Sequence, residues 1–209
     1  MPTSTHRKAI AHLRSVDPVL AKIIDRVGPC RLEARRTGTH YDALVRSIVF
    51  QQLSGKAAST IHRRFMELYP GKRPRAEHVV TTEEHLLRGA GLSRQKIGYL
   101  RDLSTRVTEG SLPLAHLGRL SDEAIIEHLV QVKGIGKWTA QMFLMFRLGR
   151  PDVLPDLDLG IQNAIQRAYG LRKRPLPKDV LAIGEKWRPH ASVASWYLWR
   201  SLENGDGQL

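Results

Sequence analysis

The sequence has very little cysteine and no long apolar run. Cys30 is the single cysteine among 209 residues, so the chain lacks the thiols for an internal disulfide, a multi-cysteine zinc site or an iron–sulfur cluster. The longest apolar stretch, residues 142–146, is far shorter than the ~20 residues that span a bilayer. The first sixteen residues are basic and lack the apolar core of a signal peptide. The sequence therefore predicts a cytoplasmic protein, nucleoid-associated if bacterial, with no membrane partner.

Acidic residues are also scarce. There are 20 Asp and Glu against 33 Lys and Arg, which leaves a formal charge of +13. An excess of this size favours a polyanionic partner, such as nucleic acid or an acidic membrane. The basic residues are spread along the chain, which indicates a basic face on a folded body rather than a disordered arm. A soluble protein that simply has a high isoelectric point is the alternative.

Strand-like alternation, repeats and low-complexity segments are absent, and helical periodicity takes their place. With 42% hydrophobic residues the chain is expected to fold. No linker is long enough to separate independent domains, so residues 1–209 are predicted to form a single all-α module. Apolar residues recur at helical spacing within residues 19–27, 44–53, 57–68, 82–88, 93–107, 122–130, 138–148, 159–169, 179–187 and 189–202.

Two glycines interrupt this pattern between two helical runs. Residues 132–140 read Val-Lys-Gly-Ile-Gly-Lys-Trp-Thr-Ala. Gly134 and Gly136 permit positive φ and close approach of a partner, and the helix that follows directs its first N–H groups at whatever binds there. Ile135 is expected to fill the gap between the helices, while Lys133 and Lys137 add positive charge. The pattern predicts that main-chain N–H groups and lysines bind a DNA phosphate here. An ordinary tight turn between two helices is the alternative.

This segment, together with residues 155–160 (Pro-Asp-Leu-Asp-Leu-Gly) and 48–58 (Ile-Val-Phe-Gln-Gln-Leu-Ser-Gly-Lys-Ala-Ala), resembles the helix-hairpin-helix DNA glycosylase superfamily. The similar branch is the 3-methyladenine DNA glycosylase II type, with a weaker match at residues 187–189. The resemblance runs from about Tyr41 to the C-terminus, and the N-terminal mixed sheet domain of some members has no counterpart. It implies two helical lobes flanking a cleft for DNA and a base: residues 41–154, with the hairpin at 130–140, and residues 1–40 with 155–209.

The implied activity is a monofunctional DNA glycosylase that flips an alkylated base out of duplex DNA and hydrolyses its N-glycosidic bond, initiating base excision repair. The protein is expected to be a monomer that needs no cofactor. A bifunctional glycosylase/lyase and a non-catalytic DNA-damage or DNA-structure binding protein are the alternatives. Charged 3-methyladenine, 7-methylguanine and 1-methyladenine, and neutral hypoxanthine and ethenoadenine, all fit the pattern, with no preference indicated for the opposite base.

Two aspartates are candidates for the catalytic carboxylate. A carboxylate stabilises the positive charge that develops on the sugar and orients or deprotonates the attacking water. By resemblance, the catalytic residue is the aspartate directly before Leu-Gly, which is Asp158. A helix N-cap is its alternative role, and one carboxylate can do both. Asp156 is interpreted as a solvated loop acid or a partner of Asp158.

The expected base pocket contains Trp138, Met142 and His190. The lyase branches carry a nucleophilic lysine two residues after the second hairpin glycine, and here Trp138 occupies that position. Lys137 is one residue early, about 100° away around the helix, so no Schiff-base lysine is evident. An aromatic face suits a cationic alkylated base; a core role is the alternative. Met142 and His190 stand where other members carry aromatics, which puts the substrate range in doubt.

At the break between the helical runs 44–53 and 57–68, the resemblance implies further contacts with DNA. Gln52 and Leu53 are expected to enter the duplex as a wedge, with core packing of Leu53 as the alternative. The predicted DNA contacts otherwise come from Ser54, Lys56, Lys133, Gly134, Gly136, Lys137 and Thr139. The family hairpin often holds a monovalent cation on main-chain carbonyls, and the matching carbonyls are those of Val130, Val132 and Ile135. Three aromatic residues near the C-terminus, Trp196, Tyr197 and Trp199, are expected to be core.

Overall fold

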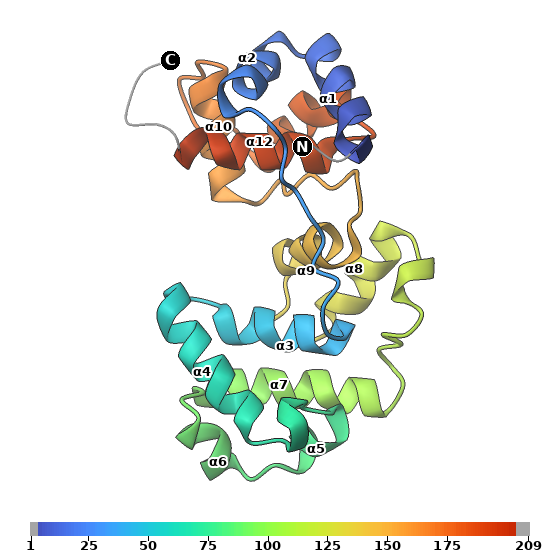
Figure 1. Cartoon of the computed structure of the whole chain (residues 1–209), viewed down its shortest axis with the longest axis vertical. Helices are drawn as coiled ribbons and strands as arrows, with labels where there is room; N and C mark the ends of the chain where they lie inside the picture. The colour runs from blue at the N-terminus through green and yellow to red at the C-terminus, as the bar shows by residue number, and fades with distance from the viewer. Residues whose placement is uncertain (1–3, 204–209) are drawn as a thin grey trace. The chain divides into compact units, whose positions relative to one another are not determined.

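The computed structural model describes residues 4–203, and the chain is helical in that range without any strand (Figure 1). The all-α prediction is confirmed. The α-helices are α1 Ser4–Val16, α2 Pro18–Val27, α3 His40–Phe50, α4 Gly55–Glu67, α5 Ala76–Thr81, α6 Glu84–Gly89, α7 Arg94–Thr108, α8 Asp122–Val130, α9 Lys137–Phe143, α10 Leu159–Ala168, α11 Pro177–Gly184 and α12 Ala191–Glu203. Short 3₁₀ turns occur at Pro70–Lys72, Leu117–Arg119 and Glu185–Trp187.

The chain forms two compact units. Unit 1 contains residues 1–35 and 144–209, and unit 2 contains residues 36–143. One unit is thus inserted in the sequence of the other, as the predicted lobes are, but the boundaries differ from those predicted at residues 40/41 and 154/155. The second boundary falls earlier because α9 ends at Phe143 and the chain continues as a π-helical segment, Leu144–Leu148, that belongs to unit 1. The predicted helix over residues 138–148 is confirmed, with its second half in the π-helical conformation.

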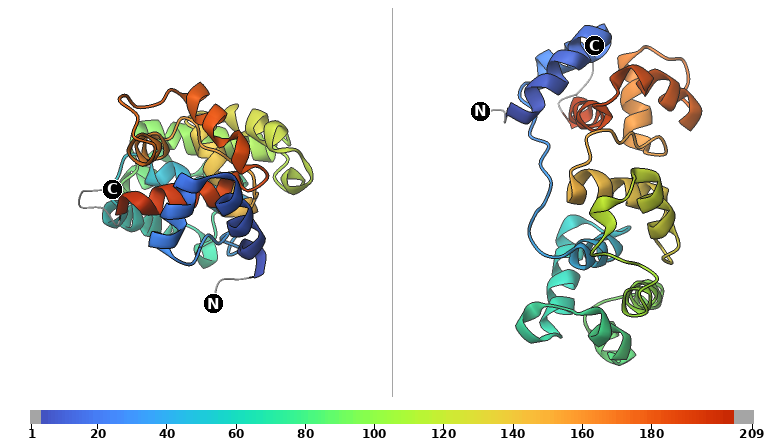
Figure 2. Two further views of the ribbon diagram at one scale, coloured as in Figure 1. Left: turned by 90° about the horizontal axis from the view of Figure 1, so that it is seen from above. Right: turned by 90° about the vertical axis from the view of Figure 1, so that its right-hand side faces the viewer.

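Unit 1 is built around α12, which packs against α1, α2 and α10 (Figure 2). Sequence analysis did not predict α1, because Ala9 and Leu13 are its fully buried side chains and most of its other residues are polar. The expectation that Trp196 and Tyr197 are core is confirmed. The buried cluster of this unit includes Leu13, Leu20, Ile23, Ile24, Cys30, Ile161, Ile165, Trp187, Trp196, Tyr197 and Leu198.

Asp17 lies at 0% exposure inside unit 1. Its Oδ1 caps α2 by accepting two main-chain N–H groups of the first turn at 3.0 and 3.1 Å. Its Oδ2 accepts the Trp187 Nε1–H at 2.7 Å and the Tyr169 hydroxyl, and lies 3.2 Å from Lys186 Nζ. Burial raises the pKa of Asp17, but these hydrogen bonds outweigh it and hold the pKa below the ordinary value of a carboxyl. The carboxylate therefore ties α2 to residues of the C-terminal half of the chain.

Replacing Asp17 by Ala is expected to lower the free energy of unfolding by roughly 3–5 kcal/mol, since a helix cap is lost and buried donors are left unsatisfied. Asp25→Ala is the matched control, because Asp25 forms an exposed ion pair with Arg14 that is worth about 1 kcal/mol or less. The Asp17 contribution is fully present above its unfolded-state pKa and is lost as the pH falls through the lower folded-state pKa. Urea melts at neutral and acidic pH measure both effects; equal stability of the two variants would contradict them.

Unit 2 is organised around α7, which packs against α3, α5 and α6. Helix α3 in turn contacts α4 and α9, and α8 contacts α9. In α3, the predicted apolar stripe is buried at Leu44, Val45, Ile48 and Val49. Among the described residues, no helix is long and apolar enough to cross a membrane.

Candidate active site

The hairpin predicted at residues 130–140 joins α8 to α9 in unit 2. Helix α8 ends at Val130, and two turns follow, in which Val132 N–H donates to Leu129 O at 3.1 Å and Ile135 N–H donates to Val132 O at 3.0 Å. Val132 and Ile135 are buried, as a side chain that packs between two helices must be. Helix α9 then begins at Lys137, and its first N–H groups point toward the glycine turn.

The two hairpin glycines differ in whether the protein itself requires them. Gly134 has φ +81°, and a Cβ built on it would lie 2.2 Å from the Tyr99 ring. The conformation and the packing inside the protein therefore both demand glycine here. A Cβ on Gly136 would meet no atom within 4 Å, and its φ lies outside the left-handed region. Nothing inside the protein requires glycine at 136, which leaves room for a partner to approach the main chain.

The side chains around these glycines form an exposed basic edge. Lys133 and Lys137 are exposed, and Lys133 N–H donates to Asp102 Oδ2 at 2.9 Å, which anchors the turn to α7. The Thr139 side chain is buried. Its predicted DNA contact is therefore restricted to the main-chain N–H, because a buried hydroxyl does not reach a phosphate outside.

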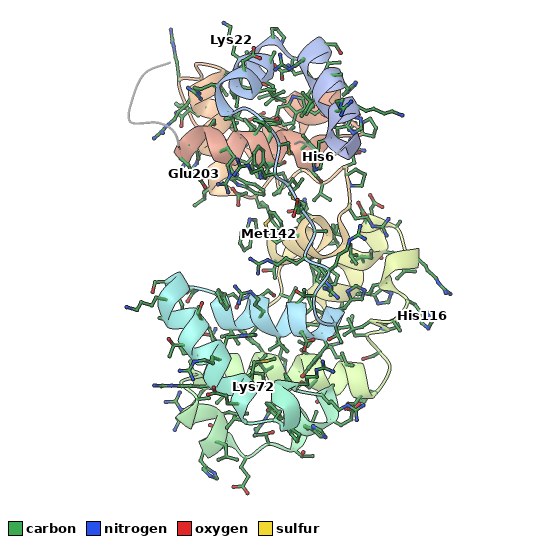
Figure 3. The ribbon with its side chains drawn as sticks, in the orientation of Figure 1. His6, Lys22, Lys72, His116, Met142 and Glu203 are labelled. Carbon is green, nitrogen blue, oxygen red and sulfur yellow. The ribbon has the colours of Figure 1, made fainter. Side chains whose placement is uncertain are left out.

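Trp138 follows in the first turn of α9 and is 44% exposed. The alternative interpretation of Trp138 as core is wrong, since almost half of this large side chain is accessible. Met142, labelled in Figure 3, is half-buried one helical turn later, and residues four apart share a helix face. Trp138 and Met142 therefore lie on the same side of α9, as a base-binding surface would need.

The predicted wedge is an exposed turn between α3 and α4. Gln52 has φ +55°, a left-handed conformation that is uncommon for a residue with a side chain. Leu53 is 39% exposed, so its core interpretation is wrong. Ser54 precedes α4 without capping it through its side chain, and Lys56 is exposed in the first turn of that helix.

A hydrogen bond brings the wedge turn and the hairpin together. Gln51 Nε2 donates to Gly134 O at 2.8 Å, so two segments separated by more than eighty residues lie side by side in unit 2. Sequence analysis did not identify this role for Gln51. A glutamine that ends a helix has no sequence signature for a partner so distant along the chain.

Asp158 lies in unit 1 and is half-buried at the start of α10. Its Oδ1 accepts Ile161 N–H at 2.8 Å, so the predicted N-cap role is confirmed. The same atom accepts Trp199 Nε1–H at 3.0 Å. Trp199 was expected to be plain core, but its indole N–H fixes the carboxylate. Two N–H donors therefore hold one oxygen of the Asp158 carboxylate in place at the start of α10.

Close packing around Gly160 leaves no room for a side chain at that position. A Cβ on Gly160 would lie 2.9 Å from Asp158 Oδ1 and 3.1 Å from Trp199 Cδ1. Any side chain would push apart the carboxylate and the indole that holds it. The glycine is therefore part of the arrangement that places Asp158.

Asp156 and His190 are the remaining predicted residues of unit 1. Asp156 is 4% exposed, so its interpretation as a solvated loop acid is wrong; its main-chain O accepts Gln162 Nε2–H at 2.9 Å. His190 is half-buried, with its ring 5.4 Å from that of His12 in an edge-to-face arrangement. Burial and the neighbouring His12 lower the pKa of His190, which favours the neutral ring near neutral pH.

The predicted cation ligands are the carbonyls of Val130, Val132 and Ile135. Val132 O accepts the Ile135 N–H and retains a second lone pair, as any carbonyl does. The monovalent cation at these carbonyls stays a prediction. No group of three or more His, Cys, Asp or Glu side chains able to hold a metal occurs within residues 4–203.

Comparison with known families gives one match over most of the chain. A model described as HhH-GPD superfamily base excision DNA repair protein matches residues 45–190. DNA-3-methyladenine glycosylase 1 of Schizosaccharomyces pombe is 35% identical over 202 residues, which make up 95% of this chain and 89% of the relative. YfjP of Bacillus subtilis is 37% identical over 169 residues; the matched region is 78% of this chain and 59% of that longer relative.

Solved structures resemble the chain over nearly its full length. The 3-methyladenine DNA glycosylase Mag1 of Schizosaccharomyces pombe, in complex with abasic DNA, has a TM-score of 0.83 at 33% identity. The similarity covers 97% of this chain and 100% of that one. A DNA-3-methyladenine glycosidase from Bacillus halodurans has a TM-score of 0.86 at 36% identity, over 96% of this chain and 92% of the other.

Proposed function

This chain belongs to the HhH-GPD superfamily of base excision DNA repair proteins, and we propose that it is a monofunctional DNA glycosylase that removes alkylated bases. The observation that carries the proposal is the Asp158 carboxylate, held by Ile161 N–H and Trp199 Nε1–H at the start of α10. The two Schizosaccharomyces pombe and Bacillus halodurans proteins compared above, at 33–36% identity, bear 3-methyladenine DNA glycosylase or glycosidase names. The activity, the base and the DNA partner come to this chain by that similarity.

The proposed reaction is hydrolysis of the bond between C1′ and the base nitrogen. As the bond breaks, its electron pair leaves with the base and positive charge develops on the sugar, where the Asp158 carboxylate stabilises it. Water then adds to C1′ and loses a proton, which Asp158 accepts or relays to solvent. A base that is already cationic departs as a neutral molecule, so no strong general acid is needed.

Trp138 supports the choice of a cationic base and of simple excision. An exposed indole face attracts a cationic, electron-poor ring once that ring has left the DNA stack. Trp138 stands where lyases carry the nucleophilic lysine and has no amine. Lys137 lies about 100° around the helix from Trp138. The chain therefore offers no Schiff-base nucleophile here, and the abasic strand is left uncut. Met142 lies on the same side of α9 as Trp138, in place of an aromatic of other members, so the base has one aromatic contact fewer on this helix and the substrate range changes accordingly.

The hairpin and the wedge turn supply the grip on duplex DNA. The exposed Lys133, Gly136 and Lys137 face a phosphate, and the Leu53 side chain enters the space that the flipped base vacates. A monovalent cation on the hairpin carbonyls would add positive charge at the same phosphate. The protein acts as a monomer and needs no cofactor for the chemistry.

Duplex affinity is expected to fall steeply with salt and not to depend on sequence. Each neutralised phosphate contributes a slope of about −0.9 to the plot of log K against log salt concentration. Lys133→Gln should reduce the slope by about one, because the lysine ammonium is exposed beside the hairpin. Glu109→Gln, an exposed change after the end of α7, is the control. Fluorescence anisotropy across a salt series measures the slopes, and a flat wild-type response would contradict the phosphate grip.

Base release from alkylated DNA tests the function itself. Duplex DNA treated with a methylating agent is incubated with the protein, and free bases are identified by chromatography. We expect release of 3-methyladenine, 7-methylguanine or both. A panel of single-lesion duplexes then ranks these against 1-methyladenine, hypoxanthine and ethenoadenine. Tight binding to damaged duplexes with no base released from any of them would support a non-catalytic binding protein instead.

A further inference from the structure

Lys96, a lysine outside the predicted site, contacts the main chain just before and at the start of the wedge turn, residues 51–54. Lys96, in the first turn of α7, donates from Nζ to Val49 O at 2.6 Å and to Gln51 O at 2.8 Å. These two carbonyls lie at the C-terminal end of α3, immediately before Gln52 and Leu53. Helix α7 runs beside α3 in this unit (Figure 1), so the contact bridges two packed helices.

The contact stabilises the C-terminal end of α3, where main-chain carbonyls would otherwise lack a hydrogen-bond partner. The last carbonyls of a helix have no partner within it, and a cation at this end also complements the helix dipole. The chain then enters the left-handed conformation of Gln52, with φ +55°, which is costly for a residue that has a Cβ. Lys96 thus fixes the carbonyls on one side of a strained turn whose tip is exposed.

The same face of α7 also holds the hairpin. Tyr99 packs its ring against Gly134, and Asp102 accepts Lys133 N–H. Residues 96, 99 and 102 follow at intervals of three, which places them along one side of a helix. Gln51, whose main-chain O accepts from Lys96, donates its side chain to Gly134. One face of α7 therefore contacts both the wedge turn and the hairpin and fixes their positions relative to each other.

We propose that Lys96 is a positioning residue that holds the turn 51–54 in the conformation that presents Gln52 and Leu53 to duplex DNA. The inference rests on the proposed function, because it assumes that this turn enters a duplex. Lys96 does not touch DNA itself, and its ammonium is directed at main-chain carbonyls. Lys96 is half-buried, and this partial burial lowers the pKa of its ammonium.

The experiment compares four single variants. Lys96→Met removes the ammonium and retains the aliphatic stem, whereas Lys96→Arg retains charge and several donors. Leu53→Ala removes the wedge itself. Arg88→Met is the matched control, because Arg88 NH1 likewise donates to a carbonyl in unit 2, Leu92 O at 2.8 Å, away from the turn. If Lys96→Met does not fold, Lys96→Gln, which is too short to span both carbonyls, replaces it.

Wedge insertion is first measured without any chemistry. A duplex carries a tetrahydrofuran abasic analogue and 2-aminopurine as the neighbouring base, whose fluorescence responds to loss of stacking when a side chain enters. At saturating protein, Lys96→Met and Leu53→Ala should lose most of the wild-type fluorescence change, while Lys96→Arg and Arg88→Met should retain it. An unchanged amplitude in Lys96→Met overturns the proposal. This result is independent of whether the protein excises any base.

Single-turnover excision of one paired lesion gives the second measurement. Lys96→Met should slow the step about tenfold, ~1.4 kcal/mol, with duplex affinity within threefold of wild type. Combining it with Leu53→Ala should add little, because both changes remove the same function. A purely structural role predicts additive losses and a drop shared by Arg88→Met, and that outcome overturns the proposal. Absence of excision by the wild type would count against the proposed function alone, since the fluorescence test stands apart from it.

Discussion

Asp158→Asn is expected to slow base release on the order of a thousandfold while leaving the fold and the affinity for DNA nearly unchanged. Asparagine is as good an N-cap as aspartate, and its Oδ1 can still accept Ile161 N–H and Trp199 Nε1–H. The substitution therefore removes the negative charge and little else. Loss of a charge that stabilises a transition state costs about 10²–10³ in rate, and loss of a general base 10²–10⁴.

Single-turnover release from methylated duplex DNA measures this effect, with anisotropy for affinity and a thermal melt for folding. Asp156→Asn is the informative comparison, because Asp156 is nearby in sequence but buried. We expect a small change in release for this variant. A variant at Asp158 that releases base at the wild-type rate, or an Asp156 variant with the larger loss, would move the catalytic role away from Asp158.

Alanine at the two hairpin glycines is expected to separate folding from DNA binding. Gly134→Ala should lower the free energy of unfolding by at least about 2 kcal/mol, because it combines overpacking against Tyr99 with φ +81°. Gly136→Ala should leave stability within about 1 kcal/mol. It should weaken duplex affinity about tenfold for every sequence, since the new methyl group stands where a phosphate approaches.

Urea unfolding and anisotropy on two unrelated duplexes measure this pair of effects. Gly118→Ala, at a site where a Cβ meets nothing within 4 Å, controls for glycine replacement in unit 2. If Gly136→Ala bound DNA as tightly as wild type, the open space at Gly136 would have no role in the complex. If Gly134→Ala were fully stable, the packing of Tyr99 on the hairpin would have been overestimated.

Local signals carried much of the prediction. The proline after Asp17 and the apolar stripe behind it indicate α2, and the glycines of residues 134–136 indicate the hairpin. Asp158 at the start of a helical run indicates the cap, whereas its catalytic role is implied by the family resemblance and stays a prediction. Each of these features depends on residues within one or two helical turns, so a single sequence contains the whole pattern.

The missed contacts are those between residues far apart in the chain. Trp199 and Asp158 are separated by 41 residues, and Lys96 and Gln51 by 45. Tryptophan among aromatic neighbours has the composition of a core helix, and a lysine on an amphipathic helix has that of a solvated face. Only tertiary packing brings Trp199 to the Asp158 carboxylate and Lys96 to the carbonyls of Val49 and Gln51.

The alternatives left open at single side chains were decided by exposure. Leu53 and Trp138 both fit an apolar helix stripe, yet each remains substantially exposed. Asp156 fits a polar loop, yet it is buried. Periodicity places a side chain on a helix face, but it does not say whether another helix covers that face.

The central claim is that this chain hydrolyses the glycosidic bond of an alkylated base and does nothing further to the strand. One duplex with a single 7-methylguanine and an end label tests it on one gel. The labelled strand should stay intact after incubation, break at the lesion once an endonuclease specific for abasic sites is added, and form no adduct with protein when borohydride is present. Cleavage without the endonuclease, together with a borohydride-trapped adduct, would show a lyase. A strand that resists the endonuclease after incubation, with this lesion and with 3-methyladenine, would contradict the claim altogether.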